Sequence, residues 1–154
     1  MNFELSEEHK MIRDAAREFA QELKTGVIER DELAKFPFEF VKQMGELGFM
    51  GIMTPEQYGG AGLDTLAYVL VLEEISKIDA SAAVIVSAHN SLVLWGLNEY
   101  GSQEQKQKYL VPLAKGEKLG AFALSEPEAG SDASSQHTTA EDKGDHYLLN
   151  GFQS

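Results

Sequence analysis

The sequence predicts a mainly α-helical domain that is followed by the first strands of a β domain. Apolar residues recur at helical spacing from position 7 onward, and this period disappears after Lys118. A Lys143-Gly144-Asp145 turn then separates two short segments typical of paired strands. The helical domain is therefore expected over residues 1–118, and a truncated β domain over residues 119–154.

The first two helices are indicated by their capping residues. Ser6 can cap a helix from Glu7 to Leu23, with two acidic residues in its first turn. A second helix is expected from Pro37 to Leu47, because proline is favoured in a first turn and Gly48 can end the helix. The apolar face of the first helix consists of Met11, Ile12, Ala15, Ala16, Phe19, Ala20 and Leu23.

Two more apolar helices are expected in the middle of the chain. Asp64 is a candidate N-cap for a helix that runs to Lys77 and is apolar nearly all round, which indicates a central position. Residues 81–95 are again mostly apolar, and their length favours a buried helix over a strand. A capping box of Ser102 and Gln105 indicates a further helix, which is expected to end before Pro112.

Composition excludes several classes of function. The chain has no cysteine, which rules out disulfides, zinc–thiolate sites and iron–sulfur clusters in it. Its formal net charge of −12 argues against binding to nucleic acid or to an anionic membrane surface. No apolar run is expected to span a bilayer. No basic region followed by an apolar stretch precedes the first helix, so a cytoplasmic location is expected.

The titratable residues show no pattern of a metal or dinucleotide site. Four histidines lack metal-ligand spacing and are interpreted as surface or core residues: His9, His89, His137 and His146. No G-x-G-x-x-G sequence follows a strand, which argues against a Rossmann site. We therefore expect no metal ligand in this chain.

The most informative segment is Ala-Leu-Ser-Glu-Pro-Glu-Ala-Gly-Ser-Asp at positions 123–132. Gly130 lets the main chain approach a ligand without a Cβ in the way. Ser131 adds a hydroxyl beside its own N–H, and successive N–H groups can form an anion-binding nest. Pro127 favours a turn. Taken alone, these residues also fit an ordinary acidic surface turn, because short motifs match often by chance.

This segment resembles the signature loop of the acyl-CoA dehydrogenases, a family of flavoproteins. Further segments resemble the family in the same order along the chain, and they begin at Phe3, Tyr58, Leu72, Gly101 and Tyr109. One position departs from the pattern, because Glu128 stands where many members have glycine. Among the members, the chain is most similar to the short-chain, butyryl-type enzymes.

The resemblance implies an FAD-dependent oxidoreductase that converts acyl-CoA thioesters to trans-2-enoyl-CoA in fatty-acid β-oxidation or amino-acid breakdown. In the family a carboxylate removes the α proton, the β hydrogen leaves as hydride to the flavin, and electrons pass to an electron-transfer flavoprotein. That carboxylate lies in a C-terminal helical domain absent from this chain, so the chain alone is expected to be inactive. A homotetramer of the full-length protein is also implied.

The resemblance assigns cofactor contacts to the signature loop. Ser125 is implied to hydrogen-bond the pyrimidine edge of the flavin. Ser131 is implied to meet the FAD pyrophosphate or the acyl-CoA, whereas Asp132 orders the loop. His137 stands where many members have a basic residue, so a phosphate contact is implied for it. The residues implied to line FAD are Phe122, Ala123, Leu124, Ser125, Glu126, Pro127, Glu128, Ala129, Gly130 and Ser131.

Two alternatives stay open. An acyl-CoA oxidase of the same fold would show a similar sequence and would differ in how its reduced flavin reacts with oxygen. A non-catalytic helical interaction module would keep the fold without the chemistry, and Glu128 together with the missing C-terminal domain motivates it.

Overall fold

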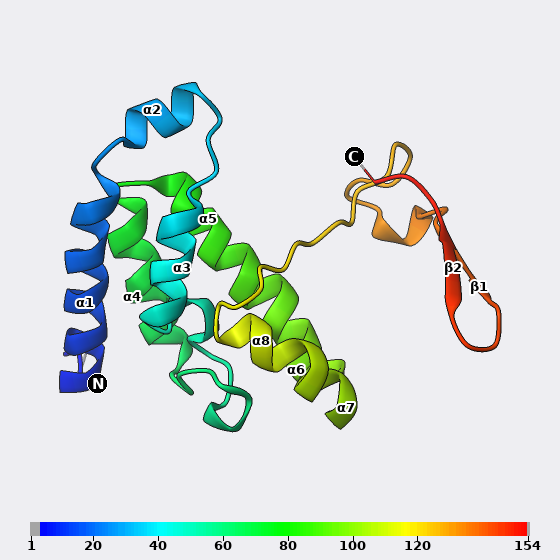
Figure 1. The fold of residues 1–154 in the computed structure, drawn as a ribbon, viewed down its shortest axis with the longest axis horizontal. Helices are drawn as coiled ribbons and strands as arrows, with labels where there is room; N and C mark the ends of the chain where they lie inside the picture. Colours follow the sequence, from blue (N-terminus) through cyan, green and yellow to red (C-terminus); the bar gives the residue numbers. More distant parts are fainter. Residues whose placement is uncertain (1–3, 154) are drawn as a thin grey trace. The chain divides into compact units, whose positions relative to one another are not determined.

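The computed structural model describes residues 4–153, so Phe3 and Ser154 lie outside the described residues. The chain divides into two compact units, one reaching to Ala121 and the other beginning at Phe122. Figure 1 labels the helices and strands of both units. The domain boundary expected between residues 118 and 119 stays a prediction.

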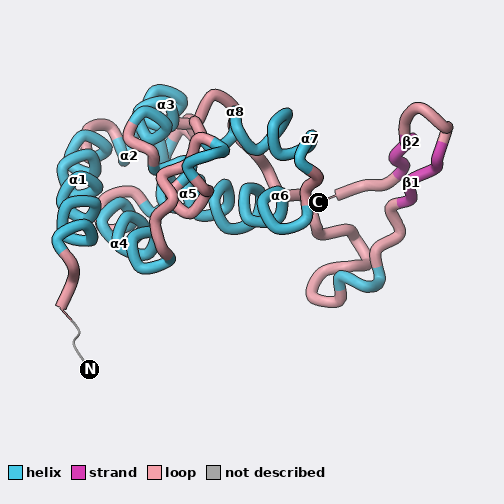
Figure 2. Tube along the Cα trace, turned by 90° about the horizontal axis from the view of Figure 1, so that it is seen from below, coloured by secondary structure: helices cyan, strands magenta, loops and turns pink. Residues whose placement is uncertain are grey.

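In the helical unit, α1 (Glu7–Leu23) packs along α4 (Thr65–Ser76), and α3 (Phe38–Glu46) lies next to them (Figures 1 and 2). Ser6 caps α1 by accepting a hydrogen bond from the His9 N–H at 3.1 Å. Asp64 caps α4 by accepting one from the Ala67 N–H at 2.9 Å. Both predicted helix starts are confirmed.

A short helix, α2 (Val27–Glu32), lies between α1 and α3 and was not expected from the sequence. None of its residues is buried, and no side chain caps its N-terminus. It therefore lacks both the apolar period and the capping residue by which a helix is recognised. Two short 3₁₀ turns, Phe49–Gly51 and Glu56–Tyr58, connect α3 to α4.

One continuous helix of 21 residues, Ala80–Tyr100, crosses the unit. It consists of α5 (Ala80–Ser87), a π-helical segment (Ala88–Leu94) and α6 (Trp95–Tyr100). The helix expected over residues 81–95 is confirmed, and it continues further than the apolar run. The core side of this helix packs against α4 and the turn Phe49–Gly51.

This helix corrects one expectation about membranes. Ala80–Tyr100 has 21 residues and contains an 18-residue window with a mean hydropathy of 1.4, so it is long and apolar enough to cross a bilayer by length and composition only. The expectation that no run could do so was wrong, because α6 extends the helix beyond the apolar residues that ended the predicted one. Core helices of soluble proteins pass the same test, and buried polar side chains in the middle of this helix bond other parts of the unit.

The final helical stretch begins as predicted but ends later. Ser102 and Gln105 form the predicted capping box at α7 (Gln103–Gln105). The expected end before Pro112 is wrong, because a π-helical segment (Lys106–Leu110) leads into α8 (Val111–Ala114). Pro112 lies in the first turn of α8, directly after the π-helical segment.

The apolar core of the unit lies between α1, α3, α4 and α5. Phe19 of α1 packs edge-to-face on Phe49 with ring centroids 5.9 Å apart. A smaller cluster of Tyr58, Leu94 and Leu110 lies at the other end of the long helix. The residues of the main cluster include Leu23, Met44, Met50, Ile52, Val71, Ile75 and Val86.

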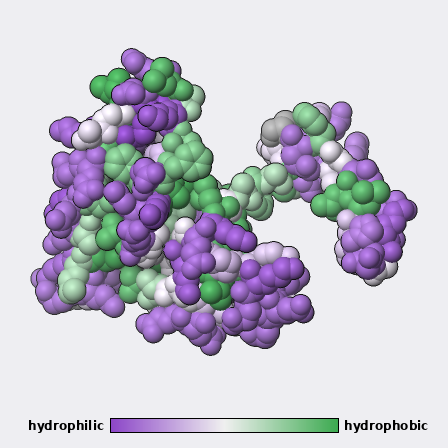
Figure 3. All heavy atoms as spheres, viewed as in Figure 1, coloured by the Kyte–Doolittle hydropathy of each residue, from purple (hydrophilic) through white to green (hydrophobic). Residues whose placement is uncertain are grey.

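The second unit contains a 3₁₀ turn, Ala133–Ser135, and the predicted hairpin. Strands β1 (Thr139–Asp142) and β2 (Tyr147–Asn150) are antiparallel, and Gly144 takes the left-handed conformation in the turn between them. Every residue of both strands is exposed. Figure 3 shows hydrophobic surface on this unit, where Phe122, Leu149 and Phe152 are exposed. The unit therefore depends on hydrogen bonds more than on a core.

The best-defined charge pair of the helical unit joins α1 to α4. Glu74 is 5% exposed and accepts hydrogen bonds from Arg17 Nη2 at 3.0 Å and Nε at 3.1 Å. Lys77 Nζ donates to the same carboxylate at 3.0 Å. The hydrogen bonds from Arg17 lower the pKa of Glu74 from 4.5 to about 2, although burial opposes this shift.

Replacing Glu74 by Gln should destabilise the helical unit. The loss of charged hydrogen bonds is worth about 1.5–3 kcal/mol of unfolding free energy near neutral pH. The folded-state pKa of Glu74 lies below its unfolded value, so its contribution is present above the unfolded pKa and is lost as the pH falls towards about 2. The difference between Glu74→Gln and wild type should shrink over that range. Urea unfolding at several pH values, followed by circular dichroism, measures both effects.

The exposed neighbour provides the control. Among the described residues, Glu73 forms an ion pair with Lys77 at the surface. Glu73→Gln should therefore change the unfolding free energy by less than about 1 kcal/mol. Equal losses of unfolding free energy in the two variants would show that the burial of Glu74 does not increase its contribution to stability.

Candidate functional site

The signature loop lies in the second unit and is built around a closed turn. The N–H of Glu126 donates to the carbonyl of Ala129 at 3.0 Å, and the N–H of Ala129 donates back to the carbonyl of Glu126 at 3.1 Å. Pro127 occupies the second position of this four-residue turn, where its fixed φ is favoured. Ser125 directly precedes this turn and Gly130 directly follows it, so the bridge between Glu126 and Ala129 brings these two residues near each other.

Glu128, the position that departs from the family's glycine, fits this turn without strain. Among the described non-glycine residues, only Ala34 has a positive φ. Glu128 therefore adopts an ordinary backbone conformation, and glycine is not required there. Its side chain is exposed.

The two serines of the loop offer free hydrogen-bond donors. Ser125 and Ser131 are exposed, and within residues 4–153 their hydroxyls have no hydrogen-bond partner. The same holds for the backbone N–H groups of Gly130 and Ser131. A Cβ added at Gly130 would meet nothing within 4 Å, so a ligand can approach the main chain from that side. This donor set fits a phosphate or the polar edge of a ring, and it therefore fits FAD.

Two side chains brace the loop from its C-terminal side. Asp132 accepts hydrogen bonds from the Ser134 N–H at 3.2 Å, from the Ser134 hydroxyl, and from the Ser135 hydroxyl at 2.6 Å. The bonds from Ser134 and Ser135 lower the pKa of Asp132. Gln136 Nε2 donates to the carbonyl of Leu124 at 2.6 Å. Asp132 therefore caps the 3₁₀ turn Ala133–Ser135, and its implied role in ordering the loop stays a prediction.

Glu126 takes a position that the sequence did not indicate. Its carboxylate is buried and accepts hydrogen bonds from the backbone N–H groups of His137, at 2.6 Å, and Thr138, at 3.0 Å. Hydrogen bonding by Thr138 and His137 lowers the pKa of Glu126. These donors lie 11 and 12 residues further along the chain, so no pattern among neighbouring residues predicts these hydrogen bonds.

The ten residues implied to line FAD therefore differ in which groups they leave accessible to a ligand. Gly130 and the two serines present free donors, and Phe122 and Leu124 are exposed apolar side chains. The backbone of the closed turn spans positions 126–129, with the side chain of Ala129 buried. The side chain of His137 is exposed and its backbone N–H is taken by the loop. The contacts of these residues with FAD stay predictions.

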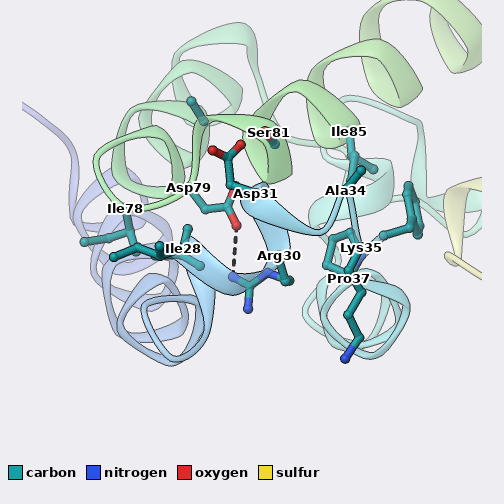
Figure 4. A pocket seen from close by; sticks show the side chains of 13 residues that line it. Ile28, Arg30, Asp31, Ala34, Lys35, Pro37, Ile78, Asp79, Ser81 and Ile85 are labelled. Carbon is teal, nitrogen blue, oxygen red and sulfur yellow. Dashed lines mark hydrogen bonds and ion pairs between the residues drawn. The ribbon is translucent and has the colours of Figure 1, made fainter.

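The helical unit has a cavity of its own beside α2 and the start of α5, with a volume of about 640 Å³ (Figure 4). Arg30 lies in its wall and donates to Asp79 Oδ2 at 3.0 Å and to the carbonyls of Leu23 and Thr25 at 2.6 and 2.7 Å. These bonds tie α2 to the end of α1 and to Asp79, the N-cap of α5. Arg30 therefore acts as a structural cation. Within residues 4–153, no three His, Cys, Asp or Glu residues lie close enough to hold a metal ion.

The family model and the curated relatives that match this chain indicate the same family. Residues 6–117 match the model of the acyl-CoA dehydrogenase N-terminal domain. A short-chain specific acyl-CoA dehydrogenase of Clostridium acetobutylicum is 52% identical over 152 residues, which cover 98% of this chain and 40% of that protein. The chain therefore spans about 40% of the length of the curated relative that it matches.

Solved structures share the fold. A structure described as an electron transferring flavoprotein of Acidaminococcus fermentans has a TM-score of 0.95 at 49% identity and covers 98% of this chain and 40% of its own. Butyryl-CoA dehydrogenase of Megasphaera elsdenii has a TM-score of 0.92 at 40% identity, over 98% of this chain and 41% of its own. An acyl-CoA dehydrogenase of Bacillus anthracis in complex with FAD has a TM-score of 0.89 at 40% identity, over 97% of this chain and 27% of its own.

Two glycine substitutions in the second unit should differ in their effect on folding. A Cβ at Gly151 would overlap the hydroxyl of Thr138, so Gly151→Ala should destabilise the hairpin by about 1–3 kcal/mol. Gly130→Ala places its methyl group in open space and should stay within about 0.5 kcal/mol of wild type. Hydrogen exchange of peptides covering β1 and β2 measures both. Faster exchange in Gly130→Ala would mean that Gly130 is needed for the fold itself.

Proposed function

The chain belongs to the acyl-CoA dehydrogenase family, and we propose that it forms the N-terminal part of an FAD-dependent enzyme that oxidises a short acyl-CoA thioester to the trans-2-enoyl-CoA. The observation that carries this proposal is the closed turn of the signature loop, which leaves the donors of Ser125, Gly130 and Ser131 free on its two sides. The short-chain assignment is supported by the named specificity of the Clostridium relative and by the likeness to butyryl-CoA dehydrogenase.

In this proposal the residues of the chain bind and orient. FAD, when bound, supplies the hydride acceptor. The Ser125 hydroxyl donates to the pyrimidine edge of the flavin, where negative charge develops on reduction. The hydroxyl and N–H of Ser131 and the N–H of Gly130 meet a phosphate of FAD or of the acyl-CoA. Removal of the α proton is assigned to a carboxylate outside this chain, because the family's base lies in a C-terminal helical domain.

We also propose an electron-transfer flavoprotein as the electron acceptor and a homotetramer as the assembly. A structure described as an electron transferring flavoprotein matches this chain, which supports the first assignment. The tetramer rests on the family alone, and light scattering of the full-length gene product tests it directly.

The coding sequence beyond codon 154 should be determined first. We expect the frame to continue into a further helical domain that carries a candidate base, and we expect the purified product to bind FAD and to lose flavin absorbance on addition of butyryl-CoA without oxygen. Fast reoxidation by oxygen would indicate an oxidase instead. A product that neither binds FAD nor bleaches would favour a non-catalytic interaction module.

Replacing Ser131 by Ala in that product should weaken binding without affecting the fold. The hydroxyl is a donor to a charged group, worth about 1.5–3 kcal/mol, which corresponds to a roughly ten- to hundredfold rise in Kd for FAD or acyl-CoA. Isothermal titration calorimetry measures this change. Ser81→Ala, at an exposed serine of α5, is the matched control. Unchanged affinities for both ligands in Ser131→Ala would remove Ser131 from the site.

A further inference from the structure

The second unit has an unusual interior. Among residues 122–153 only two side chains are buried, those of Glu126 and Ala129, and one of them carries a charge. A buried carboxylate is costly unless hydrogen bonds replace its water shell. Here that replacement comes from two backbone N–H groups, those of His137 and Thr138, and from Gln153 Nε2 at 3.4 Å.

Glu126 holds the loop through both its main chain and its side chain. Its backbone closes the turn with Ala129, as two reciprocal hydrogen bonds of 3.0 and 3.1 Å show. Its carboxylate reaches the segment that leads into β1 and the segment that follows β2. Gln153 also donates to the Thr138 hydroxyl at 2.9 Å, which ties these two segments to each other. One residue therefore joins three segments that are separate in the sequence.

The residues proposed to bind the flavin nucleotide lie directly beside this junction. Ser125 precedes Glu126 in the chain, and Gly130 and Ser131 follow the closed turn. The donors of these three residues can reach a common ligand only if the turn stays closed and stays bonded to the segment that precedes β1. The carboxylate itself is turned inward and its two oxygens are already bonded.

We propose that Glu126 is a positioning residue, whose carboxylate fastens the signature loop to the backbone of His137 and Thr138 so that Ser125 and Ser131 present their donors to FAD. Glu126 does not touch the cofactor. This inference rests on the proposed function, because it takes the ligand of the two serines to be FAD.

The test compares Glu126→Gln with Glu141→Gln in the full-length gene product. Both variants remove one negative charge from the second unit, but Glu141 is exposed and pairs with Lys143 at the surface. Glu126→Gln replaces an acceptor oxygen by an NH₂ group that faces a backbone donor. We expect it to speed hydrogen exchange in a peptide covering residues 136–142 and to raise the Kd for FAD about tenfold. Glu141→Gln should change neither quantity by more than about twofold.

A second readout separates positioning from general destabilisation. At saturating FAD, Glu126→Gln should make the reduction potential of the bound flavin more negative, because Ser125 no longer faces the charge that develops on reduction. A merely unstable variant would yield less holoenzyme with an unchanged potential. Ser125→Ala should shift the potential in the same direction, and the double variant should add little to it.

A milder variant keeps the test informative if Glu126→Gln does not fold. Gln153→Ala removes the longest hydrogen bond to the carboxylate and leaves the backbone donors in place. It should lie between wild type and Glu126→Gln in both exchange and FAD affinity. The same ranking in the two measurements supports the proposal, and a different ranking contradicts it.

Other outcomes overturn the proposal in distinct ways. Faster exchange with unchanged FAD affinity would show that the junction has no bearing on the ligand. Weaker FAD binding with unchanged exchange would show that Glu126 contacts the cofactor itself. Equal effects of Glu126→Gln and Glu141→Gln would point to charge rather than position. If the wild-type protein binds no FAD, the proposed function fails first and this inference fails with it.

Discussion

The helical unit depends on two buried polar side chains in the middle of its longest helix, His89 and Asn90. Asn90 accepts a hydrogen bond from the Ile52 N–H at 3.0 Å and donates to the carbonyl of Phe49 at 2.9 Å. His89 lies 3.0 Å from the carbonyl of Leu113 and accepts from the Gly120 N–H at 3.1 Å. Buried polar groups cost free energy unless such partners are present. These bonds therefore fix how the helix is rotated in the unit.

The state of His89 follows from the same contacts. A carbonyl can only accept and an N–H can only donate, so the ring proton lies on Nε2 and the imidazole is neutral. Burial lowers the pKa of His89 and favours that neutral form, although the bond to Leu113 opposes the shift. The π-helical segment widens the helix at this point and places both polar residues on the core side. The apolar residues Val84 and Trp95 then face outward, at 64% and 53% exposure.

The second unit also contains a buried polar side chain, that of Glu126, but it has far fewer buried apolar side chains. It lacks a cluster of large buried side chains among its described residues, and its one buried charge is matched by backbone N–H groups. A loop held by backbone hydrogen bonds keeps its shape while leaving neighbouring hydroxyls unpaired. That combination suits a ligand site, because free donors held in fixed positions bind without a further cost of ordering. The proposed roles of Ser125 and Ser131 follow from this arrangement.

Local signals in the sequence determined where most elements begin. Ser6, Asp64 and the capping box at Ser102 are read from one or two neighbours, and a hairpin turn at Gly144 is equally local. Only the tertiary structure decided the π-helical segments, the passage of the last helix through Pro112, and the role of Glu126. The buried polar contacts depend on partners between 11 and 41 residues away, such as His137 for Glu126 and Phe49 for Asn90. A pattern in neighbouring residues carries no record of such partners, because folding alone brings them together.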